Sequence, residues 1–343
     1  MMNLSRNLSA CLILLIGACA DPQSPEASLE QAPETPSAAA EQQPIVIRLG
    51  GYGPDTTSFS QGMRLIGERL TEQLGDRVDV RYVLNVLDIG YGGADLSWLV
   101  DAGLLTMAYA TMSEDRVPEL DLVALPFIFE DTAAARAAMD GPLGQAVANG
   151  IEAKRDVRVL GFFENGFRHV SNNVRPVRSP ADFAGVSIRV LQTQLRTFEL
   201  LGADGKYLPL PQVREGLASG TLDGQENPFA NAVTYNLYPL QRYYTATYHS
   251  YLSRAIFVHR PSFESWPPDV QTVLRDAVRE AVALQRSLKD DEELQAAETI
   301  RASGGEIIEL TPAERQLFID AVTPIYDEAR AGFSPELIDL IGL

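Results

Sequence analysis

In this 343-residue chain, the sequence neighbours of Arg189 indicate that its charge has a specific role. Arg189 lies inside the run Val186-Ser187-Ile188-Arg189-Val190-Leu191, which is otherwise uncharged and mostly apolar. A guanidinium group that is buried needs a counter-charge, and its paired donors match the two oxygens of a carboxylate. Arg189 therefore either binds an anionic ligand or pairs, as an ordinary strand-edge residue, with an acid at the surface.

Residues that could perform covalent or metal chemistry form no recognised motif. The sequence has no Gly-x-Ser-x-Gly elbow, no Walker phosphate loop, no His-Glu-x-x-His and no Cys-x-x-Cys. Acidic residues are plentiful, but no pair of them stands out, and the histidines are scattered at positions 169, 249 and 259. We therefore expect no cofactor, no metal site and no enzymatic turnover.

The N-terminal segment has the pattern of an export signal with a lipid-attachment site. Arg6 precedes a short apolar run, residues 12–16, and the small residues Gly17 and Ala18 stand directly before Cys19. The run is too short to span a bilayer, which needs about 20 apolar residues. The pattern predicts a lipoprotein signal peptide over residues 1–18 and a lipidated Cys19; a plain secretory signal is the alternative.

The segment from residue 19 to residue 43 predicts a flexible tether, because it is rich in Ala, Glu, Gln, Ser and Pro and has no aromatic residue. The formal net charge of the chain is −18. So acidic a balance argues against nucleic acid and against an anionic membrane surface as partners. An anionic ligand must then be held by specific local cations.

Alternating strand-like and helix-like segments predict an α/β fold with a mainly parallel sheet covered by helices. We expect strands at 45–49, 78–82, 105–108, 122–129 and 157–163, and helices at 59–74 and 132–148. Hydroxyl caps followed by proline mark helix starts at Ser179, Thr311 and Ser334. Residues 268–303 contain no Gly and, after Pro268 at the start, no Pro, so they predict one helix of about 50 Å that runs across both lobes.

Three ordered motifs then carry a resemblance to a known family. They are Gly161-Phe162-Phe163-Glu164-Asn165-Gly166-Phe167-Arg168-His169, the strand segment Phe183–Val190, and Asp223-Gly224-Gln225-Glu226-Asn227-Pro228. With weaker similarity over residues 45–330, they closely resemble the DctP family of binding proteins, which serve tripartite ATP-independent periplasmic (TRAP) transporters.

The resemblance implies roles for particular residues. Arg189 would form a two-pronged salt bridge with a ligand carboxylate, Arg168 would supply a second contact, and Asn227 would hydrogen-bond the same group, with Asn165 nearby. Further ligand-binding positions are expected at Tyr52, Tyr91, Tyr109 and Leu210. Tyrosines around the cleft suit a ligand with an aromatic or other flat apolar body; packing of loops is the alternative.

The sequence as a whole predicts a two-lobed, periplasmic-binding-protein-like α/β fold with mixed or parallel sheets. Lobe one comprises residues 45–165 and about 254–293, and lobe two residues 166–253 and about 294–343. We expect a monomeric, lipid-anchored periplasmic protein that binds a small organic acid and delivers it to the small and large membrane subunits of a TRAP permease. An ABC-type binding protein, a sensory module and an exported hydrolase or lyase remain as alternatives.

Overall fold

The computed structural model describes residues 43–112 and 117–343. The predicted signal peptide, the lipidated Cys19 and the tether up to residue 42 lie outside the described residues. Across the described ranges, no helix combines the length and the apolarity that a bilayer crossing requires.

The first segments fold as their apolar spacing predicts. Strand β1 (Ile45–Gly50) pairs in parallel with β2 (Val78–Val83), and helix α1 (Ser58–Leu74) connects them. The Thr57 side chain accepts a hydrogen bond from the Ser60 backbone N–H at the start of α1, as an N-cap does. Gly75 ends the helix with a φ of 54°, a conformation that glycine adopts at little cost.

The strands form one mixed sheet in the order β2-β1-β3-β8-β4-β7-β5-β6, with β9 paired to β8. Both ends of the sheet are parallel, whereas β3, β8, β4 and β7 pair antiparallel at its centre. The remaining strands are β3 (Met107–Ala110), β4 (Val157–Asn172), β5 (Ser187–Val190), β6 (Asp204–Tyr207), β7 (Gly224–Asn227), β8 (Tyr243–His259) and β9 (Glu306–Glu309).

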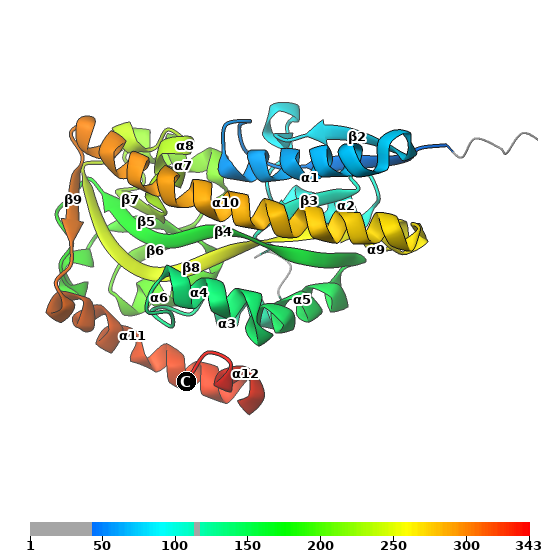
Figure 1. Cartoon of the computed structure of the whole chain (residues 1–343). Coiled ribbons are helices and arrows are strands. Elements are labelled where there is room, and N and C mark those ends of the chain that lie inside the picture. Colours follow the sequence, from blue (N-terminus) through cyan, green and yellow to red (C-terminus); the bar gives the residue numbers. More distant parts are fainter. Residues whose placement is uncertain (1–42, 113–116) are drawn as a thin grey trace, which may run out of the picture. The chain divides into compact units, whose positions relative to one another are not determined.

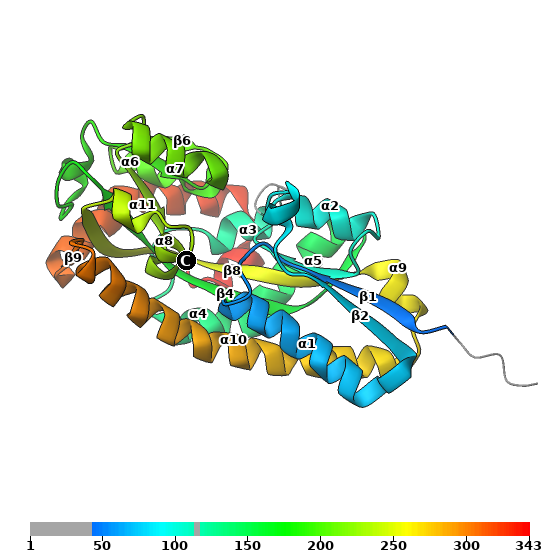
Figure 2. The same cartoon turned by 90° about the horizontal axis from the view of Figure 1, so that it is seen from above.

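Strands β4 and β8 join the two ends of the sheet because each is far longer than the others (Figures 1 and 2). Their pairing shifts register at three places, Val159/Gly161, Glu164/Gly166 and Arg168/Val170. Gly166 has a φ of 93°, which side chains other than glycine rarely adopt. Such irregularities bend strands and redirect side chains, and the one at Gly166 lies between Asn165 and Arg168.

Helix α10 (Pro268–Ala302) is the single long helix that the absence of Gly and Pro predicts. It lies alongside α1 in both views and also contacts β4 and α8 (Phe229–Thr234) (Figures 1 and 2). The other helices are α2 (Asp95–Asp101), α3 (Pro118–Val123), α4 (Thr132–Asp140), α5 (Pro142–Lys154), α6 (Leu195–Leu200), α7 (Leu210–Ser219), α9 (Arg260–Ser265), α11 (Pro312–Gly332) and α12 (Pro335–Asp339).

One predicted strand is absent from the structure and one predicted helix is divided, while the strand predicted at 157–163 continues to Asn172. The strand expected at residues 122–129 is absent: α3 begins at Pro118, with Glu119 and Asp121 in its first turn, and irregular backbone follows it. Proline at the first helical position and acids in the first turn favour a helix start. The helix expected at residues 132–148 is broken in two at Gly141, because Pro142 lacks the N–H that a continuing helix would need.

Buried apolar side chains gather in one large cluster and three smaller ones. The large cluster takes its residues from positions 47–167 and 251–281, together with Ala329 and Ile338. The second combines residues 170–201 with Phe318, Val322 and Ile325 of α11. Helix α11 thus contributes to both clusters, whereas the predicted lobe boundaries assign it to lobe two alone; the division into lobes stays a prediction.

Candidate functional site

A pocket opens where the loops after β1 and β3 face the ends of β5, β6 and β7. Six of the eight side chains predicted to bind ligand line it: Tyr52, Asn165, Arg168, Arg189, Leu210 and Asn227. Its wall also contains residues to which the sequence drew no attention, among them Thr111, Tyr207, Asn231, Tyr235 and Arg254.

Tyr91 and Tyr109 are not part of this wall. Tyr91 is exposed and packs edge-on against Trp98, with ring centroids 5.9 Å apart. Tyr109 is fully buried behind Tyr52, and its hydroxyl accepts the Tyr52 backbone N–H at 3.5 Å. Burial raises the pKa of Tyr109 to about 12, so its hydroxyl is neutral. The ligand-binding role expected of these two tyrosines stays untested.

Arg168 is buried and forms an ion pair with Glu226, which is completely inaccessible to solvent. Its Nε donates to the Glu226 carboxylate, and its Nη2 donates to the Glu226 backbone oxygen and, at 3.1 Å, to Asn227 Oδ1. Burial alone would raise the pKa of Glu226, but the Arg168 charge and the hydrogen bonds from His249 and Arg168 outweigh it and lower that pKa to about 2. The pair is therefore ionised at neutral pH.

Arg189 lies in β5 between β6 and β7 and is 5% exposed. Its Nε donates to the Leu208 carbonyl at 3.0 Å, which fixes the base of the side chain against the loop after β6. The amide groups of Asn165, Asn227 and Asn231 form a connected wall beside Arg168, because Asn231 Nδ2 donates to Asn165 Oδ1 (3.2 Å) and to Asn227 Oδ1 (3.4 Å). These donors and acceptors come from β4, β7 and α8.

Arg254 is the third arginine of the pocket and comes from β8. It is 4% exposed, and its guanidinium carbon lies 3.9 Å from the ring centroid of Phe59 and 4.6 Å from that of Tyr52. Among the residues that the structure describes, no Asp or Glu lies within ion-pair distance of it, and its Nε has no hydrogen-bond acceptor. Burial acts to lower the pKa of Arg254, but neighbouring tyrosines, including Tyr235, raise it above its ordinary value.

The electrostatics of the pocket favour an anion. Its described lining residues include three arginines and no Asp or Glu, although the chain as a whole carries a formal charge of −18. Guanidinium groups keep their charge when they are desolvated and match carboxylate geometry. In the described part of the chain, no group of His, Cys, Asp and Glu is arranged to hold a metal ion.

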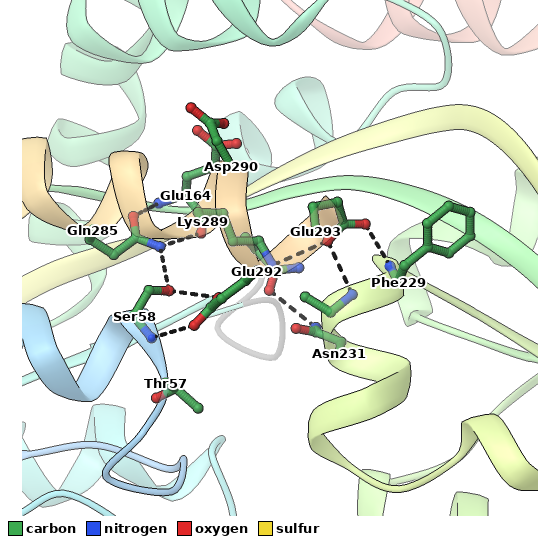
Figure 3. Close-up of polar contacts among 12 residues, drawn as sticks. Thr57, Ser58, Glu164, Phe229, Asn231, Gln285, Lys289, Asp290, Glu292 and Glu293 are labelled. Carbon is green, nitrogen blue, oxygen red and sulfur yellow. Dashed lines mark hydrogen bonds and ion pairs between the residues drawn. The ribbon is translucent and has the colours of Figure 1, made fainter. Parts of the chain in front are cut away.

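Two consecutive acids of helix α10 accept hydrogen bonds from the starts of α1 and α8, which belong to different walls of the pocket (Figure 3). Glu292 accepts hydrogen bonds from Ser58 N (2.6 Å) and Ser58 Oγ (2.9 Å) at the start of α1. Glu293 accepts from Phe229 N (2.6 Å) and Ala230 N (3.1 Å) at the start of α8. The buried Lys289 ammonium lies 4.0 Å from Glu292 and 3.5 Å from Glu293 and offsets their charge.

The sequence model of the family described as bacterial extracellular solute-binding protein, family 7 (DctP) matches residues 99–331. The C4-dicarboxylate-binding periplasmic protein DctP of Rhodobacter capsulatus is 28% identical over 300 residues, which cover 86% of this chain and 90% of that protein. The 2,3-diketo-L-gulonate-binding periplasmic protein YiaO of Escherichia coli K12 is 30% identical over 207 residues, which cover 60% of this chain and 62% of that protein.

The fold matches solved relatives over nearly their whole length. A TRAP periplasmic solute-binding protein from Xanthobacter autotrophicus Py2, solved with bound β-D-galacturonate, superposes with a TM-score of 0.77 at 26% identity. The match covers 86% of this chain and 97% of that protein. The fold is thus that of the two-lobed, mixed α/β periplasmic binding proteins.

The chain belongs to the DctP family of bacterial extracellular solute-binding proteins. The identification from the three sequence motifs is therefore confirmed. Members of this family are solute-binding proteins of transport systems and not enzymes, so the hydrolase and lyase alternatives fall away. Membership of this family also means that the chain is a TRAP-type and not an ABC-type binding protein.

Proposed function

We propose that this protein captures a small organic acid outside the cytoplasm and delivers it to the small and large membrane subunits of a TRAP permease. The observation that carries the proposal is the pocket wall with three arginines and no described acid, on a chain that is strongly acidic elsewhere. Such a pocket attracts a carboxylate through local charge and not through the general field of the protein.

Within the pocket, Arg189 makes the two-pronged salt bridge with the ligand carboxylate. Arg168 is already paired with Glu226, so its contribution is a directed hydrogen bond more than a net charge. Asn227 adds a hydrogen bond through its amide, whose orientation Arg168 and Asn231 fix. This division of roles is supported by the contacts of Arg168 and Asn227 and by the position of all three side chains in the wall.

The body of the ligand lies against Tyr52, Tyr207, Tyr235 and Leu210. An aromatic or flat apolar ligand therefore still finds rings in this wall, although Tyr91 and Tyr109 are not among them. Sugar acids and dicarboxylates are the competing ligand class, because solved and sequenced relatives are named for such ligands. Binding of polar acids alone would overturn the aromatic-ligand hypothesis.

Closure of the pocket is the step that would signal occupancy to the permease. The two walls are joined by β4, β8 and α10, so closing requires these elements to bend, and a ligand drives closing only if it binds the closed state more tightly. Two of the three register shifts of β4 and β8 lie beside the pocket residues Asn165 and Arg168, where bending would act directly on the site.

A thermal-shift screen tests the proposal with mono- and dicarboxylates, sugar acids and aromatic acids on the wild type, Arg189→Ala and the control Arg242→Ala. Arg242 is an exposed arginine outside the pocket. A ligand at a hundredfold its Kd stabilises the wild type by about 2.7 kcal/mol. Arg189→Ala should lose about 2–5 kcal/mol of binding energy, and Arg242→Ala none. Equal shifts in all three proteins would remove Arg189 from the anchor role.

We also propose that Cys19 is lipidated after residues 1–18 are removed, that residues 19–43 tether a monomeric binding protein to a bacterial membrane, and that the protein works in the periplasm. The Gly17-Ala18-Cys19 sequence supports the lipid attachment. Labelled palmitate should enter the wild-type protein and not Cys19→Ser, and light scattering should give the mass of one chain. Label in Cys19→Ser would refute the assignment.

A further inference from the structure

Arg254 carries a charge that the described protein does not neutralise. It is 4% exposed, and its guanidinium carbon lies 3.9, 4.6 and 5.8 Å from the ring centroids of Phe59, Tyr52 and Tyr109. The only polar side chain that hydrogen-bonds it among the described residues is the neutral Tyr235. Aromatic faces attract a cation, but they replace only part of the hydration that a buried guanidinium loses. Burying an arginine in this position costs folding free energy unless an anion binds beside it.

Part of the hydrogen-bonding capacity of Arg254 is unfilled. Its Nε has no acceptor among the described residues, and Arg254 forms part of the pocket wall. Arg168 differs in this respect, because Glu226 and Asn227 accept from it. The pocket therefore contains one arginine that is neutralised from within the protein and another that is not.

Arg254 also stands apart from the site proposed for the first carboxylate. Arg168 hydrogen-bonds Glu226 and Asn227 of β7, and Arg189 donates to Leu208, which follows β6. The Arg254 guanidinium lies over the aromatic rings at 52, 59 and 109, which follow β1, begin α1 and lie in β3, and it also hydrogen-bonds Tyr235, which ends α8. One ligand in the pocket can therefore meet an arginine of each wall with a different group.

We propose that Arg254 is a specificity-determining residue that binds a second anionic group of the ligand. This inference rests on the proposed function and narrows it. The ligand is an organic acid with two negatively charged groups, a carboxylate that Arg189 and Arg168 hold and a second carboxylate or sulfonate that Arg254 holds. A hydroxyl or amide in the second position would leave the Arg254 charge uncompensated, so monoanionic acids bind more weakly.

Matched ligand pairs test the inference by calorimetric titration of the purified full chain. Succinate is compared with succinamate, glutarate with glutaramate, and 3-sulfopropionate with propionate, while galacturonate represents acids with a single charge. Each pair keeps the first carboxylate and removes the second charge. The wild type should bind at least one doubly charged acid about tenfold or more tightly than its partner, which a difference of one charged hydrogen bond readily supplies.

Three variants separate the role of Arg254 from general effects of charge and folding. Arg254→Gln should abolish the preference for the doubly charged acid, because the affinity for that acid falls to the level of its singly charged partner. Arg254→Lys keeps the charge without the paired donors and should retain part of the preference. Arg242→Gln removes an exposed arginine that also lies over an aromatic ring, 5.0 Å from that of Tyr243, and should retain all of it.

The outcomes distinguish the inference from the function on which it rests. If the members of every pair bind the wild type equally, if galacturonate binds and no doubly charged acid does, or if Arg254→Gln keeps the preference, Arg254 is not a second anion site, whereas capture of an organic acid stands. If no acid of either kind binds the wild type, both proposals fall. Loss of the preference in Arg254→Gln and not in Arg242→Gln, with binding of the singly charged acid still measurable, supports the inference.

Discussion

Glu292 and Glu293 are neighbours in the sequence, yet their carboxylates accept hydrogen bonds from the first turns of two different helices, α1 and α8 (Figure 3). Successive side chains of a helix point about 100° apart, so one turn of α10 can reach both. Helix α1 carries Phe59, which packs on Arg254, and α8 carries Asn231, which lines the pocket. The two acids lie at the predicted lobe boundary and connect both pocket walls to one helix.

Replacing either acid by its amide should destabilise the protein. A carboxylate at a helix N-terminus accepts from free N–H groups and offsets the helix dipole, so Glu292→Gln and Glu293→Gln should each lose about 1–2 kcal/mol of unfolding free energy in urea. The double variant should lose more than the sum, because the buried Lys289 then has neither carboxylate beside it.

The neighbouring Asp291 gives the matched control, since it is exposed on the same helix. Asp291→Asn removes the same charge and should change the unfolding free energy by less than about 0.5 kcal/mol. Equal losses in Asp291→Asn and Glu293→Gln would attribute the effect to net charge and not to the helix starts.

Glu226→Gln should be among the most damaging single changes of a charged residue. It leaves Arg168, 2% exposed, without its counter-charge, and breaking a buried pair in this way costs about 3–5 kcal/mol. The control is Glu328→Gln, which breaks an exposed pair with Arg196 and should cost at most about 1 kcal/mol. Urea unfolding of both variants makes the comparison, and similar small losses would mean that the Arg168–Glu226 pair is not desolvated as the structure indicates.

The sequence predicted those parts of the site that lie in regular elements with a strong local pattern. Arg189 could be found because a charge interrupts an apolar run, and α10 because no helix breaker follows Pro268 up to residue 303. Strand β4 was predicted to end at Phe163 but continues to Asn172. Its pattern is interrupted by Glu164, Asn165 and Arg168, of which Asn165 and Arg168 line the pocket.

Arg254 was missed although it gives the same signal as Arg189. It interrupts the run Ser250-Tyr251-Leu252-Ser253-Arg254-Ala255-Ile256, which carries no other charge. Its place in the pocket depends on β8 pairing with both β3 and β4, a long-range arrangement that local spacing does not contain. The same limit applies to Tyr91 and Tyr109, since the direction in which a loop or strand side chain points is set by tertiary packing.

Arg254→Met should cost little stability in the absence of ligand, in contrast to Glu226→Gln. Removal of a buried charge without an ionic partner relieves its desolvation, and the loss of contact with the Phe59 ring opposes this gain. We expect the unfolding free energy to fall by less than about 1 kcal/mol or to rise. A loss as large as that of Glu226→Gln would mean that Arg254 serves the fold and not the ligand.

The buried histidines should make the protein sensitive to mild acid. Burial, together with the charges of His249, Arg168 and Lys289, lowers the pKa of His169 to about 3, and burial also lowers the pKa of His249. Between the ordinary histidine pKa of about 6.5 and these lower values, the unfolded chain binds protons that the folded chain does not, so stability falls as pH falls. The contribution of Glu226, whose pKa is lowered to about 2, is lost only below about pH 4.5.

The window between pH 6.5 and 4.5 therefore separates the contribution of the histidines from that of Glu226. His169 stacks near Phe229 and Tyr248, with ring centroids 4.3 and 4.5 Å away, so His169→Phe keeps an aromatic ring there and removes one titrating group. Each such group contributes up to about 1.4 kcal/mol per pH unit, so urea unfolding should show a clearly shallower pH dependence in His169→Phe than in the wild type. If the two proteins lose stability at the same rate over this window, His169 is not held neutral by burial, and the acid sensitivity has to arise elsewhere.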